Sequence, residues 1–254
     1  MIVDSWLPCY ANLIISRRHR LIFCPVPKVA CSNWKMTLRQ ASGFDDFTDD
    51  HLAHDRENNG LDYLGRHNRL VRLRYLNDPR YTKACFVRNP WTRALSGYRS
   101  KLEGALAKRA GDADDPRSSW IFRSVEAVKE FCRANGQIED DGSPEVTFGE
   151  FLNYLEGTPP AALNEHWQPQ SLITGFERIK YDFVGRLETL SEDAARLIER
   201  TGLPALYTGP VKTVPPTRSK DDDVLRRYFT PERIAQVGRI YAADIAFLGY
   251  QPPL

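Results

Sequence analysis

Three short apolar runs along the chain are each followed by a segment with helical spacing. The runs cover residues 21–26, 84–88 and 181–187. Helices are predicted after them at residues 32–39, 91–102 and 191–201. Ser32 is a suitable N-cap for the first, Pro90 a favoured first residue of the second, and Gly202 a fitting end of the third. Strands alternating with helices predict an α/β fold with a central parallel sheet flanked by helices.

The remaining segments lack this alternation. Residues 104–146 contain two acidic, glycine-containing stretches around one predicted helix at residues 124–134, and we interpret them as a largely helical insertion with loops. The tail over residues 221–248 has helical character, with Pro231 predicted to start the last helix. The sequence contains no internal repeat, so we expect a single domain over residues 1–254.

Composition narrows the function classes. The chain has 254 residues, 42% of them apolar, and its 35 basic and 33 acidic residues give a net charge of +2. Nucleic-acid binding favours a clearly basic domain, so no nucleic-acid partner is expected. The number of cysteines, five, is odd, and their spacing suggests neither zinc binding nor a disulfide framework. Buried, reduced thiols and a reducing compartment are therefore expected.

The N-terminal residues predict neither a signal peptide nor a membrane span. They lack a basic start followed by a clean apolar stretch, and no segment approaches eighteen uninterrupted apolar residues. We therefore expect a cytoplasmic location. A lumenal domain cut from a membrane anchor is the less favoured alternative.

A first polar cluster follows the first predicted strand at residues 27–35, with the sequence PKVACSNWK. Ligands bind open α/β sheets at the carboxyl ends of strands, and helix N-termini attract anions. Lys28 and the Ser32 hydroxyl would add donors there. The segment contains no glycine and its lysine precedes the serine by four residues, so it is not a Walker A loop.

A second polar cluster follows the second predicted strand at residues 87–98, with the sequence VRNPWTRALSGY. Arg88 at the strand end could bind a phosphate through two nitrogens. Ser96 lies two helical turns further on and would reach the same group only if the ligand lay along the helix. A nucleotide with phosphates at both ends of its ribose would need two such sites.

These clusters resemble the motifs PKVACTNWK and VRDPFxRLxSAY of the membrane-type carbohydrate O-sulfotransferases, with the chondroitin/dermatan 4-O- and HNK-1-type enzymes most similar. Residues 165–170 resemble the family's HWxP segment, residues 181–190 its YDFIGxxETL segment, and residues 244–250 its terminal DxxxFGY pattern. The resemblance therefore extends in order from about residue 21 to residue 250.

The resemblance implies a P-loop-like sulfotransferase fold and transfer of a sulfuryl group from 3′-phosphoadenosine-5′-phosphosulfate (PAPS) to a carbohydrate hydroxyl, with adenosine 3′,5′-bisphosphate as product and no metal. The acceptor would be a polysaccharide, an oligosaccharide or a glycolipid head group. Lys28 would stabilise the leaving group, and Arg88 and Ser96 would bind the 3′-phosphate. Arg186 either contacts ligand or pairs with Glu188. The implied nucleotide-binding residues are Pro27, Lys28, Val29, Ala30, Cys31, Ser32, Asn33, Trp34, Arg88, Ser96 and Arg186.

Two histidines are candidates for the base that removes the proton from the acceptor hydroxyl. Histidine suits this role because it titrates near working pH. His67 precedes Arg88 at about the distance that the resemblance implies for a catalytic histidine. His166 belongs to the HWxP-like segment and is the second candidate. Glu165 and Glu188 are weaker ones.

Departures from the family pattern leave other functions open. Asn89 replaces the usual aspartate, and the missing N-terminal anchor favours a bacterial, cytoplasmic relative. A nucleotide kinase of similar architecture would need a glycine-rich phosphate loop, which is absent. A non-catalytic nucleotide- or glycan-binding relative would have lost Lys28 or every candidate base. The acceptor groove is also open: aromatic and basic residues that could line it are Arg69, Arg72, Arg74, Trp120 and Trp167.

Overall fold

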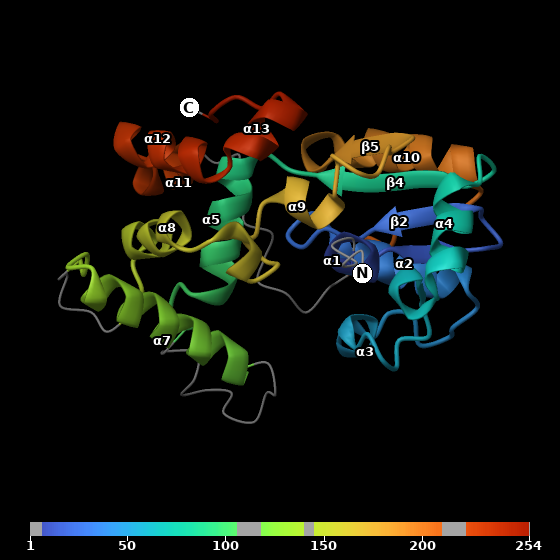
Figure 1. Ribbon diagram of the computed structural model, residues 1–254, viewed down its shortest axis with the longest axis horizontal. Coiled ribbons are helices and arrows are strands. Elements are labelled where there is room, and N and C mark those ends of the chain that lie inside the picture. Colours follow the sequence, from blue (N-terminus) through green and yellow to red (C-terminus); the bar gives the residue numbers. More distant parts are fainter. Residues whose placement is uncertain (1–6, 106–117, 140–144, 210–221, 254) are drawn as a thin grey trace. The chain divides into compact units, whose positions relative to one another are not determined.

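A five-stranded mixed sheet organises the first of two units into which the chain divides. The computed structural model describes residues 7–105, 118–139, 145–209 and 222–253 (Figure 1). The first unit contains Met1–Arg88 and Gln170–Thr213, and the second contains Asn89–Pro169 and Val214–Leu254. The single domain expected over residues 1–254 stays a prediction beside this division. Within the described residues, no helix is both long and apolar enough to cross a membrane.

The strand order is β3-β1-β2-β4-β5. Strands β2, β4 and β5 are parallel, which confirms the predicted central parallel sheet, and β2 and β4 point the same way in Figure 1. Two short strands absent from the prediction, β1 and β3, pair antiparallel to each other, and β1 also pairs antiparallel to β2. The strands are β1 (Ile14–Ser16), β2 (Leu21–Cys24), β3 (Asp62–Tyr63), β4 (Thr82–Val87) and β5 (Phe183–Arg186).

Helices and short 3-10 turns complete the first unit. They are α1 (Leu7–Ala11), α2 (Cys31–Ala41), α3 (Asp50–His54), η1 (Leu64–Arg66), α4 (Arg69–Asn77), α9 (Gln170–Thr174), η3 (Leu187–Thr189) and α10 (Leu190–Thr201). Gly202 ends α10 at φ 66°, as predicted, because glycine adopts this left-handed conformation without a Cβ clash.

The core of the first unit is aromatic. Trp34 of α2 packs between Phe23 of β2 and Phe86 of β4, with ring centroids 5.1 and 4.7 Å apart respectively. Gly185 of β5 lies opposite Phe86, and a Cβ there would come within 2.3 Å of the Phe86 ring. The glycine therefore lets the phenyl ring cover the strand. These contacts fix α2 against the parallel strands.

Helices make up the second unit. They are α5 (Pro90–Lys101), α7 (Ser118–Ala134), α8 (Phe148–Gly157), η2 (Pro160–Ala162), α11 (Asp222–Tyr228), α12 (Pro231–Ile240) and α13 (Ala242–Leu248). The helix predicted at residues 124–134 starts earlier, in α7. Pro231 begins α12 rather than the last helix, because Tyr241 interrupts the tail before α13. Of the two acidic stretches, residues 111–116 and 140–142 lie outside the described residues.

Aromatic packing and one buried ion pair hold these helices together. Tyr98 of α5 contacts the rings of Phe148 and Phe151 of α8. Lys129 of α7 binds the fully buried carboxylate of Glu150 at 2.7 Å. Glu150 also accepts a hydrogen bond from the backbone of Thr147, which completes a capping box at the start of α8. Removing one partner of such a pair would leave an uncompensated buried charge.

Candidate functional site

The loop after β2 has an unusual backbone for a segment without glycine. Lys28 has φ 70° and Ala30 has φ 54°, two of three non-glycine residues with positive φ in the described chain. Such positions cost on the order of 1–3 kcal/mol each and cluster at ligand sites. Successive N–H groups in mixed left- and right-handed conformations form a concave anion-binding backbone. The loop geometry therefore fits the predicted anion site.

The start of α2 differs from the prediction. Ala30, not Ser32, is the N-cap, and no side chain makes a capping hydrogen bond there. The first intrahelical bond runs from the Trp34 N–H to the Ala30 carbonyl at 3.1 Å. The left-handed turn at Ala30 starts the helix earlier than the serine would, so Ser32 lies in the first turn. The N-terminal N–H groups of α2 are consequently not occupied by a capping side chain.

The predicted loop residues divide into two sets. The Pro27, Val29 and Trp34 side chains are buried, and the indole of Trp34 serves the core, so its predicted ligand contact finds no support. The partly exposed set is Lys28, Ala30, Cys31, Ser32 and Asn33. Asn33 donates from Nδ2 to the Tyr207 carbonyl at 2.8 Å, and Thr37 accepts from the Tyr207 N–H at 2.9 Å. Asn33 therefore anchors α2 to the segment after α10.

Arg88 lies directly beyond β4 and is almost completely buried, at 6% exposure. Its backbone N–H donates to Gln170 Oε1 at 2.9 Å, and Gln170 Nε2 donates to its carbonyl at 2.8 Å. Its guanidinium donates to the Lys28 carbonyl at 3.3 Å. The structure therefore places the Arg88 guanidinium against the Lys28 backbone, so the two residues predicted from separate motifs are neighbours. Gln170, which locks the Arg88 backbone, was missed, although it ends the HWxP-like segment.

Arg186 lies at the same edge of the sheet, because its Cα is the register partner of Val87 on β4. Its backbone N–H donates to Asp193 Oδ2 at 2.7 Å, and its side chain is exposed. Glu188, its predicted pairing partner, follows in η3. Ligand contact by Arg186 stays a prediction.

The rest of the second motif belongs to the second unit. The Asn89 side chain caps α5 by accepting from the Trp91 and Thr92 N–H groups, and its Nδ2 donates to the Gln251 carbonyl at 2.8 Å. An aspartate could cap equally but has no N–H for that carbonyl. This explains structurally the departure from the family's usual residue. Ser96 is buried on α5 at 8% exposure, and its predicted phosphate contact stays a prediction.

Arg93, in the middle of this motif, is structural. Its guanidinium is buried and donates to the carbonyls of Gln168 at 2.7 Å and Glu165 at 3.1 Å. It therefore fixes the backbone of the HWxP-like segment. Trp167 in that segment is buried at 1% exposure, and its predicted place in an acceptor groove stays a prediction.

His166 has a well-defined tautomer. Asn164 Oδ1 accepts from the His166 backbone N–H at 3.0 Å and lies 2.7 Å from Nδ1 of its ring. Because an amide oxygen can only accept, a hydrogen bond at this distance requires hydrogen on Nδ1, which leaves Nε2 as the nitrogen that can accept a proton. Trp120 stacks on the imidazole at a centroid distance of 5.1 Å, and Lys101 Nζ lies 5.1 Å from the Trp120 ring centroid. This geometry suits a general base beside a polar ligand.

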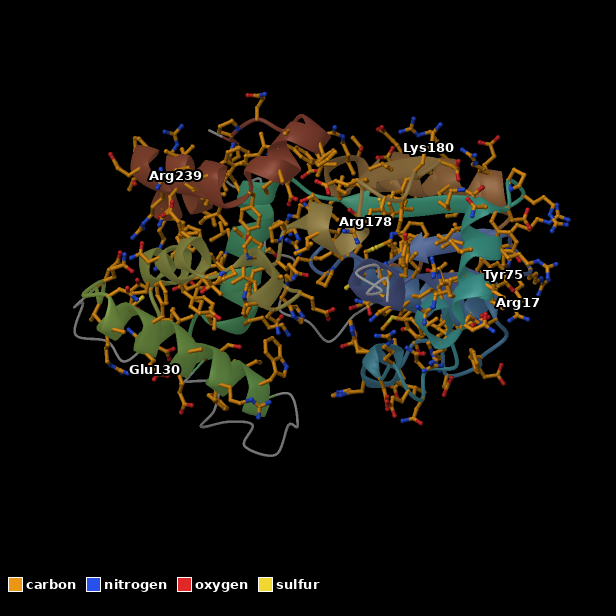
Figure 2. The ribbon with its side chains drawn as sticks, in the orientation of Figure 1. Arg17, Tyr75, Glu130, Arg178, Lys180 and Arg239 are labelled. Carbon is orange, nitrogen blue, oxygen red and sulfur yellow. The ribbon has the colours of Figure 1, made fainter. Side chains whose placement is uncertain are left out.

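His67, the other candidate base, lies elsewhere on the sheet. Its Nε2 is 2.7 Å from Asp62 Oδ1, and the other carboxylate oxygen of Asp62 binds Arg17. The His67 ring also contacts the ring of Tyr75. Tyr75 in turn packs on Tyr81, just before β4. Figure 2 shows Arg17 and Tyr75 beside the end where β4 begins.

Lys28 and Arg88 lie beyond the carboxyl ends of β2 and β4, at the edge of the sheet opposite to the one near His67. The structure thus does not bring His67 to them, and a role for it as base gains no support. Arg72 donates to the His67 and Gly65 carbonyls, whereas Arg69 and Arg74 are exposed on α4 nearby. The segment over residues 210–221, which contains Arg218 and Lys220, lies outside the described residues.

The five cysteines are all free, and four of them are buried, as predicted. Cys31, in the first turn of α2, is the partly exposed one. Burial raises the pKa of the Cys85 thiol well above its ordinary value. Among the described residues, no group of three or more His, Cys, Asp or Glu side chains is placed to hold a metal ion.

Three parallel strands, a helix start suited to an anion after one of them and a buried arginine after the next form the arrangement expected of a P-loop-like nucleotide site. The model of the sulfotransferase family matches residues 11–251, and the chain belongs to that family.

Among its relatives, carbohydrate sulfotransferase 14 of Danio rerio is 32% identical over 76% of this chain and 49% of its own length. Carbohydrate sulfotransferase 9 of Homo sapiens is 31% identical over 92% of this chain and 48% of its own length. Carbohydrate sulfotransferase 12 of Xenopus laevis is 27% identical over 95% and 60%, respectively. The chain thus spans about half the length of the first two. No solved structure matches it significantly.

Proposed function

We propose that this protein transfers a sulfuryl group from PAPS to a hydroxyl of a carbohydrate acceptor. The observation that carries the proposal is the meeting of Arg88 and Lys28 beside the left-handed loop and helix start after β2. In the transfer, the sulfur–oxygen bond to the donor's 5′-phosphate breaks, a bond to the acceptor oxygen forms, and a base takes the acceptor's proton. Adenosine 3′,5′-bisphosphate leaves.

The residues present fit such a donor. Two phosphate-bearing ends require two sets of cationic and N–H donors, and the first unit offers them at adjoining strand ends. Lys28, with the N–H groups at the start of α2, would neutralise the 5′-phosphosulfate. Arg88, whose backbone Gln170 holds in place, would bind the 3′-phosphate. Positioning and charge stabilisation are the main contributions that such a transfer needs from a protein.

We assign the base to His166. Asn164 orients its ring so that Nε2 accepts the proton, and Trp120 stacks on the imidazole. Aromatic faces with a nearby cation suit a sugar that carries negative charge, and Lys101 provides the cation. Relatives named carbohydrate sulfotransferases support the acceptor class. The expected cytoplasmic location and the absence of a metal requirement stay predictions.

Arg88→Ala tests the donor site. Titration calorimetry with adenosine 3′,5′-bisphosphate should show binding weakened by about 1.5–3 kcal/mol, the range for a hydrogen bond to a charged group. Arg80→Ala is the matched control, because Arg80 is exposed and paired with Asp78 before β4 begins. Absence of binding by folded wild-type protein would exclude the sulfotransferase function. Equal affinities of Arg88→Ala and wild type would remove Arg88 from the site.

His166→Gln tests the base. With PAPS and a panel of polysaccharide and glycolipid acceptors, kcat should fall about 10²–10⁴-fold, the usual contribution of a general base. The affinity for adenosine 3′,5′-bisphosphate should stay unchanged. His67→Gln serves as the comparison and should retain most of kcat. The reverse ranking of the two variants would return the base to His67.

A further inference from the structure

One histidine that the sequence did not single out touches the predicted anion loop. His54, the last residue of α3, lies with Nε2 2.7 Å from the Ser32 hydroxyl. Its side chain is 38% exposed, so it borders solvent rather than filling the core. Twenty-two positions separate the two residues in the chain, and only the packing of α3 against α2 brings them together. Ser32 lies in the first turn of α2, beside the N–H groups assigned to the donor's phosphate.

The charged neighbours of His54 favour one tautomer of its ring. Lys35 of α2 places Nζ 3.5 Å from Nδ1, and an ammonium group can only donate. The Asp50 carboxylate of α3 lies 3.6 Å from Nε2, and it favours a proton on that nitrogen. Both neighbours therefore select the form with a lone pair on Nδ1 and hydrogen on Nε2.

This tautomer determines what the Ser32 hydroxyl can do. With hydrogen on Nε2, His54 donates to Ser32 Oγ at the short distance observed. The serine then uses its own hydrogen for a third group rather than for the imidazole. Donors in such a chain polarise one another, so each strengthens the next. The result is a chain of hydrogen bonds in which Lys35 donates to His54 and His54 donates to Ser32, so that the Ser32 hydroxyl can donate to an acceptor outside the chain. We call this chain the relay.

We propose that His54 is a positioning residue that keeps the Ser32 hydroxyl as a hydrogen-bond donor to the phosphosulfate end of the nucleotide. The inference rests on the proposed function, since it assumes an anion at the start of α2. It adds to that function a second polar group from α3, a helix outside both phosphate motifs. Asp49 secures the start of α3 by accepting from the Leu52 N–H at 3.0 Å.

Calorimetric titration with adenosine 3′,5′-bisphosphate tests the inference through four proteins: wild type, Ser32→Ala, His54→Leu and the double variant. Each single change should weaken binding about threefold to tenfold, the effect of one net hydrogen bond. The double variant should bind no more weakly than Ser32→Ala, because His54 acts through the serine. Additive losses would show that His54 acts independently of Ser32 and would overturn the relay.

Rescue and control variants separate positioning from simple packing. His54→Gln retains an N–H near the place of Nε2 and should restore most of the affinity, whereas His54→Leu should not. His51→Leu changes the exposed histidine one turn earlier on α3 and should leave binding unchanged. If His54→Leu fails to fold, long-range ¹H–¹⁵N NMR of the wild-type imidazole decides. The Nε2–H tautomer is expected, and an Nδ1–H tautomer would contradict the proposal.

The outcomes distinguish this inference from the proposed function. If folded wild type does not bind adenosine 3′,5′-bisphosphate, the proposed function fails and the inference fails with it. If wild type binds and Arg88→Ala weakens binding while His54→Leu equals wild type, the donor site stands. Only the role of His54 is then overturned.

Discussion

The two polar segments that follow β2 and β4 both connect a parallel strand to a helix but differ in how their side chains are used. After β2, the backbone adopts left-handed conformations at Lys28 and Ala30, and no side chain caps α2. After β4, Asn89 caps α5, and Arg93 is buried against two backbone carbonyls. In the first segment, no capping side chain occupies the N–H groups at the start of α2. In the second segment, most polar groups hydrogen-bond within the protein, and Arg88 is the residue proposed to bind the ligand.

This difference shows that one motif can contain two kinds of residue, those that could bind a ligand and those that hold the fold. Within residues 87–98, Arg88 is the residue proposed to bind ligand, whereas Asn89 and Arg93 build the scaffold. Within residues 27–35, Trp34 is the scaffold residue, packed between two phenylalanines. The comparison therefore predicts which substitutions unfold the protein and which weaken only ligand binding.

Trp34→Ala should have the largest effect on stability. Removing a fully buried indole from an aromatic core costs about 3–5 kcal/mol. Urea denaturation would measure the loss in the free energy of unfolding. Ser32→Ala, two residues earlier on the same helix, is the control and should change it by less than about 0.5 kcal/mol. A loss below about 1 kcal/mol for Trp34→Ala would place the indole outside the core.

Arg93→Met should have the second-largest effect on stability. The change leaves the carbonyls of Gln168 and Glu165 without their buried donor, at an expected cost of about 2–4 kcal/mol. Arg99→Met on the same helix is the control, since Arg99 forms a partly exposed pair with Glu103 worth about 0.5 kcal/mol. Thermal and urea unfolding would measure both. Similar losses in the two variants would contradict the structural role of Arg93.

Asn89→Asp should have a smaller effect. The carboxylate retains the N-cap of α5 but cannot donate to the Gln251 carbonyl, so about 1 kcal/mol of stability should be lost. Asn89→Ala removes both functions and should cost about 2 kcal/mol. Urea denaturation of the three proteins would rank them. An aspartate variant as stable as wild type would show that the Gln251 contact contributes nothing.

Thiol labelling should disturb the fold least, and it reports directly on ligand binding at the segment after β2. Cys31 is the partly exposed cysteine of the five, so one thiol should react quickly with a disulfide reagent in the native protein. Buried Cys85, whose pKa burial raises, should react only on unfolding. Adenosine 3′,5′-bisphosphate should slow the labelling of Cys31. Unchanged labelling at saturating ligand would separate the ligand from the start of α2.

The sequence predicted what local chemistry determines. Apolar runs located β2, β4 and β5, Pro90 located the start of α5, and Gly202 located the end of α10. Strands β1 and β3 escaped because three- and two-residue strands have too few positions to show alternation. The N-cap of α2 was wrong because a left-handed turn at Ala30 competes with the serine, and nothing in the residue types signals it.

The candidate site was predictable only where one motif contains the residue. Lys28 and Arg88 each follow a strand within a motif, and parallel pairing brings their strand ends together. The role of His67 as base stays a prediction, and spacing along the chain could not reveal its contact with Asp62. Gln170, Asn164 and His54 act through partners that tertiary packing supplies, so their roles became readable only in three dimensions.

The pairing of β5 with β4 has a consequence for how the chain folds. Ala84 is the register partner of Phe183, and the segment between these strands includes α5, α7 and α8 of the second unit. The parallel pairing of β4 with β5 should form late in folding, because the entropy of closing so long a connection must be overcome before the contacts form. Refolding should therefore show β5 gaining amide protection after β2 and β4. Lengthening the connection twofold would cost only about 0.6 kcal/mol at equilibrium, so this crossover is where the fold can accept added chain.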